Sequence, residues 1–235
     1  MKDNINNEKN IKRSLFIPDE KEIKIVNVSE NNIPINLVYS SLTPEFEEEF
    51  KAFNNKSRDN AINYIKEELN KALKHLLKCF SNPKKMACFS GKYAINMFLA
   101  KDFEEMSTTG VKSRINMPKE AIGYAPGTNL VYLQKGIINH FHKKPQYKYL
   151  ETAHELLHNF FQFNNIEKHK QIVRVPFLFN EGFEVICGNQ LNKSFNEYVN
   201  PKLLLEKMNM NFLDYDKRPI IENSTYQSAG QFMSI

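Results

Sequence analysis

Two histidines spaced four residues apart carry the clearest chemical signal in the chain. His154 and His158 lie in the run His-Glu-Leu-Leu-His, and positions four apart share one face of a helix. Two imidazoles on one face can bind a single metal ion, and Glu155 is then placed to take a proton from a metal-bound water. Chance would produce this pattern in roughly one chain in a hundred of this length. The pattern predicts a metal site, against the alternative of an accidental spacing on a buried helix.

A catalytic zinc ion normally has three protein ligands and an open fourth position. A third histidine of the metzincin type is excluded, because it would need glycine and histidine where the chain has Phe161 and Asn164. The segment Asn-Glu-Gly around Glu181 offers a carboxylate instead, and we predict Glu181 as the third ligand. Its alternative role is a solvated acid at the start of a helix. Glu184, one turn later, is the competing ligand and also a candidate acceptor for a histidine N–H.

A helix has to hold the two histidines, and the sequence around them predicts one. Pro145 marks its start. Apolar residues then recur at helical spacing: Tyr149, Leu150, Ala153, Leu157, Phe160 and Phe161. The pair of histidines therefore lies on an amphipathic helix.

The elements before this helix alternate between strands and helices. Apolar alternation and runs predict strands at 22–28, 34–39, 93–99 and 129–133, and turn residues predict a loop at 123–128. Helices are predicted to start at Thr43-Pro44, to span 57–80 with a long apolar stripe, and to span 101–106. Residues 1–13 are polar and charged and are predicted to be a disordered tail. The remaining residues, 14–235, show no linker or repeat and are predicted to form a single α+β domain.

Bulk composition limits the function classes. Hydrophobic residues make up 41% and charged residues 25% of the 235 residues, and the net charge is +5. Lysines alternate with glutamates, so no basic stripe for a nucleic acid is expected. No apolar run reaches membrane-spanning length. Three cysteines form no CxxC pair, and no signal peptide is visible, so we expect a cytoplasmic protein. A chain trimmed of a secretory leader would look the same.

The chain resembles the gluzincin metallopeptidases, in particular the peptidase MA-like domains. These share an HExxH helix followed by a segment of the type Trp-Leu-Asn-Glu-Gly-Phe-Ala-Glu-Tyr, and the corresponding segment here is 177–185. Upstream, residues 123–133 are similar to the family's edge strand beside the cleft. Downstream, the segment 226–233 is similar to its Tyr-x-x-Ala-Gly-x-Phe helix. Together these cover roughly residues 90–235, with HELLH and NEGF as the specific parts.

The resemblance implies a zincin-like fold. An N-terminal mixed-sheet lobe with a long helix would face a mostly helical C-terminal lobe, with the active-site cleft between them. The sequence departs from the family pattern in two ways, and both concern the residues that orient the metal ligands. Val185 stands where the family has an acid four residues after the ligand, and the gap from His158 to Glu181 is slightly long. Because the chain stops at Ile235 on an apolar turn, we expect the domain to be truncated there.

The leading functional hypothesis is a zinc metallopeptidase. Zn²⁺ held by His154, His158 and Glu181 would lower the pKa of its water toward neutrality, and Glu155 would act as general base. Tyr226 could hydrogen-bond the oxyanion, against the alternative of a core tyrosine. A peptide or protein substrate would pair with the strand at 129–133.

Two other functions stay open at the level of the sequence. One is a catalytically inactive zincin-like module that binds zinc and recognises a partner protein. The other is a zinc-dependent hydrolase of a non-peptide substrate.

Overall fold

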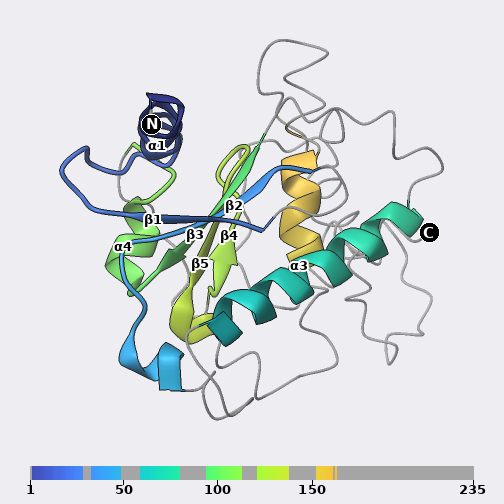
Figure 1. Cartoon of the computed structure of the whole chain (residues 1–235). Coiled ribbons are helices and arrows are strands. Elements are labelled where there is room, and N and C mark those ends of the chain that lie inside the picture. Colours follow the sequence, from blue (N-terminus) through green and yellow to red (C-terminus); the bar gives the residue numbers. More distant parts are fainter. Residues whose placement is uncertain are drawn as a thin grey trace, which may run out of the picture.

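Five strands form a mixed sheet at the centre of the computed structural model (Figure 1). Their order across the sheet is β1-β2-β3-β5-β4. Strands β2, β3 and β5 are parallel, and the outer strands β1 and β4 run antiparallel to their neighbours. The strands are β1 (Lys24–Asn27), β2 (Ile35–Tyr39), β3 (Ile95–Ala100), β4 (Gly123–Tyr124) and β5 (Leu130–Leu133). The structure describes residues 2–28, 33–48, 59–79, 94–112, 121–137, 152–160 and 162.

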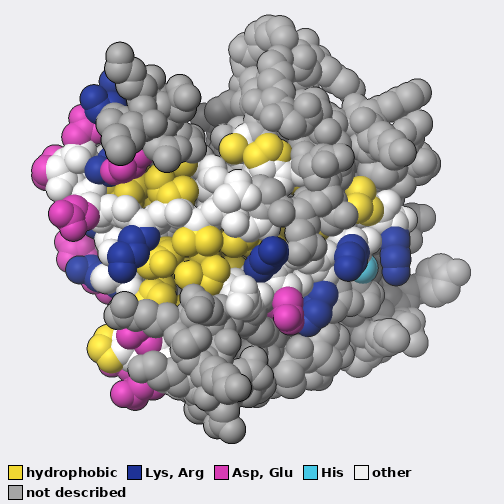
Figure 2. Space-filling view, in the orientation of Figure 1, with side chains coloured by type: hydrophobic (Ala, Val, Ile, Leu, Met, Phe, Trp, Pro, Cys, Tyr) yellow, Lys and Arg dark blue, Asp and Glu magenta, His cyan; other side chains and the backbone are white. Residues whose placement is uncertain are grey.

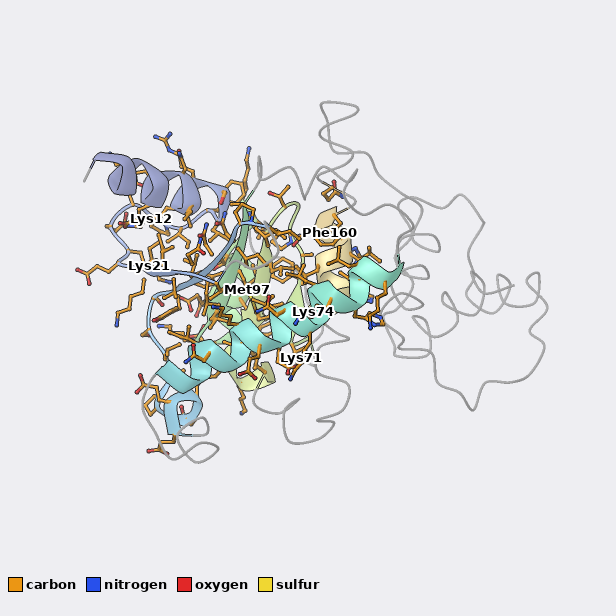
Figure 3. All side chains as sticks on the ribbon, turned by 45° about the vertical axis from the view of Figure 1, so that its right-hand side comes forward. Lys12, Lys21, Lys71, Lys74, Met97 and Phe160 are labelled. Carbon is orange, nitrogen blue, oxygen red and sulfur yellow. The ribbon has the colours of Figure 1, made fainter. Side chains whose placement is uncertain are left out.

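One face of the sheet is covered by helix α3 (Asp59–Cys79) and by the helix at 152–160, drawn in teal and orange in Figure 1. Alternate strand residues point to this face and form one core cluster with the helices. From the sheet it includes Ile35, Leu37, Met97, Leu99 and Leu130, and from the helices Leu69, Leu73, Leu76, Leu157 and Phe160. Figure 3 shows Met97 and Phe160 within this layer, with Lys71 and Lys74 on α3. The two lysines are exposed, so α3 has the amphipathic character that its sequence predicts.

The opposite face is covered by α1 (Lys2–Ser14) and α4 (Phe103–Thr108). A second cluster joins Ile11 and Leu15 to Val38 and Phe98 of the strands and to Met106 of α4. The prediction of a disordered tail at residues 1–13 is therefore wrong. The segment is polar overall, but Ile11 within it is 3% exposed, and Leu15, just after the helix, is 0% exposed. Burying these two side chains against the sheet stabilises the helix.

Most of the other predicted elements are confirmed. The two N-terminal strands form the antiparallel pair β1–β2, and the long helix and the strands β3 and β5 lie where expected. A helix follows Thr43, whose Oγ1 accepts a hydrogen bond from the N–H of Phe46 at 3.2 Å. The loop predicted at 123–128 contains strand β4 at its start. The described residues thus confirm a mixed α/β chain with a five-stranded mixed sheet. The predicted helical C-terminal lobe and the predicted cleft fall outside these residues.

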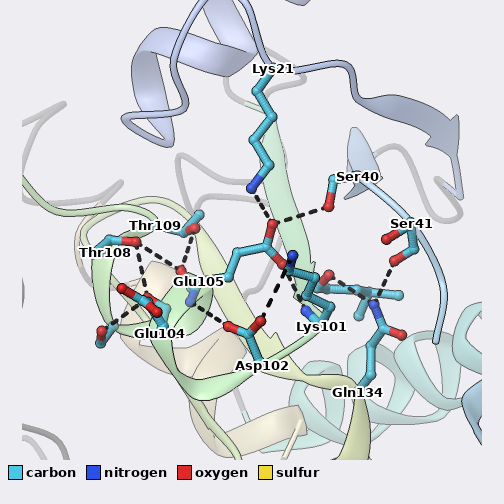
Figure 4. A network of polar contacts seen from close by, with 12 residues as sticks. Lys21, Ser40, Ser41, Lys101, Asp102, Glu104, Glu105, Thr108, Thr109 and Gln134 are labelled. Atoms are coloured by element: carbon cyan, nitrogen blue, oxygen red, sulfur yellow. Dashed lines mark hydrogen bonds and ion pairs between the residues drawn. The ribbon is translucent and has the colours of Figure 1, made fainter.

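A buried carboxylate ties α4 to the ends of the strands (Figure 4). Glu105 is 6% exposed. Its Oε1 accepts from Lys21 Nζ and, at 3.0 Å, from Ser40 Oγ, and its Oε2 accepts from the N–H of Lys101 at 2.7 Å. Asp102 caps the helix by accepting from the N–H of Glu105 at 2.8 Å. Each oxygen of the buried acid therefore has a donor, as a charge in such a position requires. These contacts have a structural role, because they attach α4 to the ends of the strands.

Asparagine side chains form a polar ladder across the sheet, on the side of α1. Asn36 of β2 donates to Asn96 of β3 at 3.0 Å, and Asn96 donates to Asn129, just before β5, at 3.1 Å. Asn96 also donates to Ser14 Oγ at 3.1 Å, and Asn129 donates to Ser14 O at 3.0 Å. Buried amides are stable only when they are hydrogen-bonded, and here the register of three parallel strands brings them together. The ladder fixes the end of α1 to the start of β5.

The surface of the described part carries charges of both signs. Figure 2 shows lysine and arginine side chains near aspartates and glutamates, with apolar side chains between them, on the face that it displays. Among the described helices, none is long and apolar enough to cross a membrane.

Candidate metal centre

The helix at 152–160 presents the predicted metal ligands from a buried position. Its apolar residues Ala153, Leu156, Leu157 and Phe160 are all 0% exposed and face the sheet side of the core. At about 100° per residue, His154 and His158 lie about 40° apart around the helix axis, on one flank of this apolar stripe. The periodicity that predicts the helix therefore also predicts the shared direction of the two histidines.

The two imidazole rings lie side by side. Their centroids are 5.0 Å apart and their planes are at 74°, and His154 is only 8% exposed. Two imidazoles bound to one tetrahedral zinc ion would each have their centroid about 3.2 Å from it, which places the centroids about 5.2 Å apart. The centroid separation alone is thus close to that of two rings on one ion. An edge-to-face ring pair has a similar separation, and zinc content distinguishes the two arrangements.

Glu155 is half-buried on the neighbouring part of the helix surface. It lies about 60° from His158 and about 100° from His154 around the axis. The carboxylate therefore lies beside the two histidines on the helix surface. A general base for a water bound between them has to be in such a position.

The remaining predicted site residues lie outside the described part of the chain. These are the third ligand Glu181, its competitor Glu184, and the oxyanion donor Tyr226. Among the residues that the structure describes, no group of three or more His, Cys, Asp or Glu side chains could hold a metal ion. The structure therefore brings together two of the three predicted ligands and the predicted base.

Asn159, which follows the second histidine, attaches this helix to the sheet. Its side chain is completely buried. Its Nδ2 donates to Asn129 O at 2.9 Å and to Gly127 O at 3.1 Å, at the turn between β4 and β5. No local pattern in the sequence indicates this residue, since an asparagine next to a histidine on a helix carries no signal of burial. Only the tertiary packing places the two carbonyl groups beneath it.

The strand expected to bind a substrate peptide is not at the edge of the sheet. Strand β5 is hydrogen-bonded to β3 on one side and to β4 on the other, with Val131 opposite Tyr124 and Tyr132 opposite Gly123. The prediction of peptide pairing at 129–133 is therefore wrong. In the described part of the sheet, the outer strand on this side is β4.

Strand β4 is held in place by its two residues. The Tyr124 hydroxyl donates to Met106 O at 3.1 Å and also to Thr109 O, and burial raises the pKa of Tyr124 to about 12. The phenol thus remains a hydrogen-bond donor even at alkaline pH, where an ordinary tyrosine would ionise. A side chain at Gly123 would meet the ring of Tyr132 at 2.7 Å, so only glycine allows this close approach. The outer strand is a fixed part of the fold despite its short length.

Comparison of the chain with protein-family models, with curated proteins and with solved structures finds no match.

Proposed function

We propose that the chain is a zinc metallopeptidase of the gluzincin type that hydrolyses peptide bonds. The observation that carries the proposal is the pair of imidazoles on the buried helix at 152–160, with ring centroids 5.0 Å apart. Glu155 lies next to them on the surface of the same helix. Histidine nitrogens are common zinc ligands, and a carboxylate is the usual third ligand in this arrangement. Glu181 is the proposed third ligand, and a zincin-like fold is part of the proposal.

The residues of the chain divide the chemistry among them. Zinc, when bound, polarises a water molecule and the substrate carbonyl. Glu155 would act as the general base for that water and would pass the proton to the leaving amine. His154 and His158 would hold the ion, and their spacing of four residues places the two rings on one side of the helix. Tyr226 is the proposed donor to the developing oxyanion.

The substrate would lie along β4. An extended peptide adds to the outer strand of a sheet by backbone hydrogen bonds, and β4 holds the outer position in the described sheet. The turn that follows β4 contacts the metal helix through Gly127 O and Asn159.

Zinc content and peptide cleavage together test the function. The purified chain is expected to retain about one zinc per chain after exhaustive dialysis, measured by elemental analysis. It is expected to cleave a broad peptide library, with the activity removed by a chelator and restored by zinc. Zinc without cleavage of any peptide would favour the inactive binding module or a zinc-dependent hydrolase of a non-peptide substrate. A chain that neither retains nor rebinds zinc would refute the metalloprotein hypothesis.

The identity of the third ligand is tested by two matched variants. Glu181→Ala should remove most of the zinc affinity, because an acid directly before the glycine can point back at the histidines. Glu184→Ala should weaken zinc binding only about 10- to 100-fold, as the loss of a residue that orients a ligand does. Zinc affinity is measured for both variants by competition with a chelator. If Glu184→Ala removes the metal and Glu181→Ala does not, the proposed assignment is wrong by one helical turn.

A further inference from the structure

The apolar contacts of the metal helix do not by themselves fix its rotation. Ala153, Leu156, Leu157 and Phe160 press the helix onto the sheet, but hydrophobic contact is non-directional. A small roll about the helix axis would keep most of this burial and would change the direction in which His154 and His158 point. A metal site needs its ligands within about 10–20° of their productive orientation. Some directional contact has to set the rotation.

Asn159 supplies that contact from the other flank of the helix. It lies about 100° from His158 and about 140° from His154 around the axis. Its two hydrogen bonds, at 2.9 and 3.1 Å, end on backbone carbonyls of Asn129 and Gly127. A donor directed at two fixed acceptors allows one rotation and one height of the helix.

The two carbonyls are themselves held by the rest of the fold. Asn129 accepts from Asn96 at 3.1 Å and donates to Ser14 O at 3.0 Å. Its side chain thus joins the ladder on the α1 side of the sheet, and its backbone carbonyl receives Asn159 from the opposite side. The start of β5 is fixed from both layers, so Asn159 is attached to a rigid point.

The amide of Asn159 is retained at a cost. Its Oδ1 is buried and has no hydrogen-bond partner in the described part of the chain, and an unpaired buried acceptor is unfavourable. A purely apolar residue would fill the space without that penalty, but it would leave the two carbonyls without their donor. The two donated bonds are therefore the function that the side chain performs here.

We infer that Asn159 is a positioning residue that sets the rotation of the metal helix, so that His154 and His158 converge on one ion. The inference rests on the proposed zinc function. It assigns Asn159 no contact with the metal or the substrate.

Asn159→Ala tests the inference through zinc affinity. The variant is expected to bind zinc about 10- to 100-fold more weakly than the wild type, the range found when groups that orient ligands are removed. In the zinc-free protein, amide hydrogen exchange of residues 152–160 is expected to be faster. If Asn159→Ala does not fold, Asn159→Ser, which keeps one donor, replaces it with the same expected direction.

Two controls separate positioning from general stability. Asn70→Ala removes another buried asparagine whose Oδ1, like that of Asn159, has no hydrogen-bond partner among the described residues. Within that part of the chain, Asn70 donates to Lys66 O of its own helix and not to the sheet. Val38→Ala opens a cavity in the α1-side cluster and should lower the melting temperature. Both are expected to keep wild-type zinc affinity.

The outcomes separate the inference from the proposed function. Wild-type zinc affinity in Asn159→Ala, or an equal loss in Val38→Ala, would overturn the inference while the zinc function stands. A wild-type chain that binds no zinc would overturn the proposed function, and the inference with it. Unchanged exchange in residues 152–160 of zinc-free Asn159→Ala would also contradict the attachment.

Discussion

Glu155→Gln is expected to retain zinc and to lose peptide hydrolysis by about 10²- to 10⁴-fold, the range that a positioned general base contributes. Glutamine has nearly the same shape as glutamate, but its amide cannot accept a proton. Glu155 is half-buried next to the two histidines and is not one of the proposed ligands. The exchange therefore removes the base and leaves the metal centre and the packing of the helix in place.

The measurement pairs zinc content with initial rates on a cleaved peptide. Glu67→Gln is the matched control, because it makes the same exchange at an exposed position of α3, and it should keep both zinc and activity. Full activity in Glu155→Gln would mean that another group takes the proton or that a contaminant cleaves the peptide. Loss of zinc in this variant would instead make Glu155 a ligand.

The parts of the fold that sequence predicted are those whose pattern is local. Helix α3 buries Ile65, Leu69, Ala72, Leu73 and Leu76, and this spacing of three and four is legible in the chain itself. The cap at Thr43 and the alternation of β1 are equally local. For the same reason, the direction shared by His154 and His158 follows from the helix alone.

The parts that sequence did not predict depend on contacts between distant segments. The stability of helix α1 depends on apolar contacts with Phe98 and Met106. These two residues lie far along the chain from the helix. Strand β4 has two residues, and it is a strand only because β5 pairs with it. Asparagines are unfavourable in strands, so the ladder of Asn36, Asn96 and Asn129 is stable only after the strands align in register.

The candidate site divides in the same way. The two histidines and Glu155 are encoded within five residues, so one helix brings them together. The proposed Glu181 and Tyr226 would have to be brought to the same place by tertiary structure, which the local pattern cannot specify. Asn159 shows what such a pattern omits, because its role depends on the position of two carbonyl groups about 30 residues earlier in the chain.

His154→Ala and His158→Ala are each expected to weaken zinc binding by more than about 100-fold. Loss of a group that merely orients a ligand costs about 10- to 100-fold, and loss of a ligand itself has to cost more. The side chains extend in one direction from a single helix, with ring centroids 5.0 Å apart. A single histidine together with the proposed ligand Glu181 would leave the ion with two protein ligands instead of three. The two variants should therefore behave alike.

Thermal unfolding with and without zinc measures this effect independently of catalysis. An ion that binds only the folded state stabilises it by about 2.7 kcal/mol at a concentration 100 times its Kd. Zinc should therefore raise the melting temperature of the wild type, but not that of either variant at the same concentration. His75→Ala, on the half-buried flank of α3, is the control and should keep the zinc-induced rise. If only one of the two variants loses it, the histidines do not share an ion, and the metal centre has to be built from that one histidine and other residues.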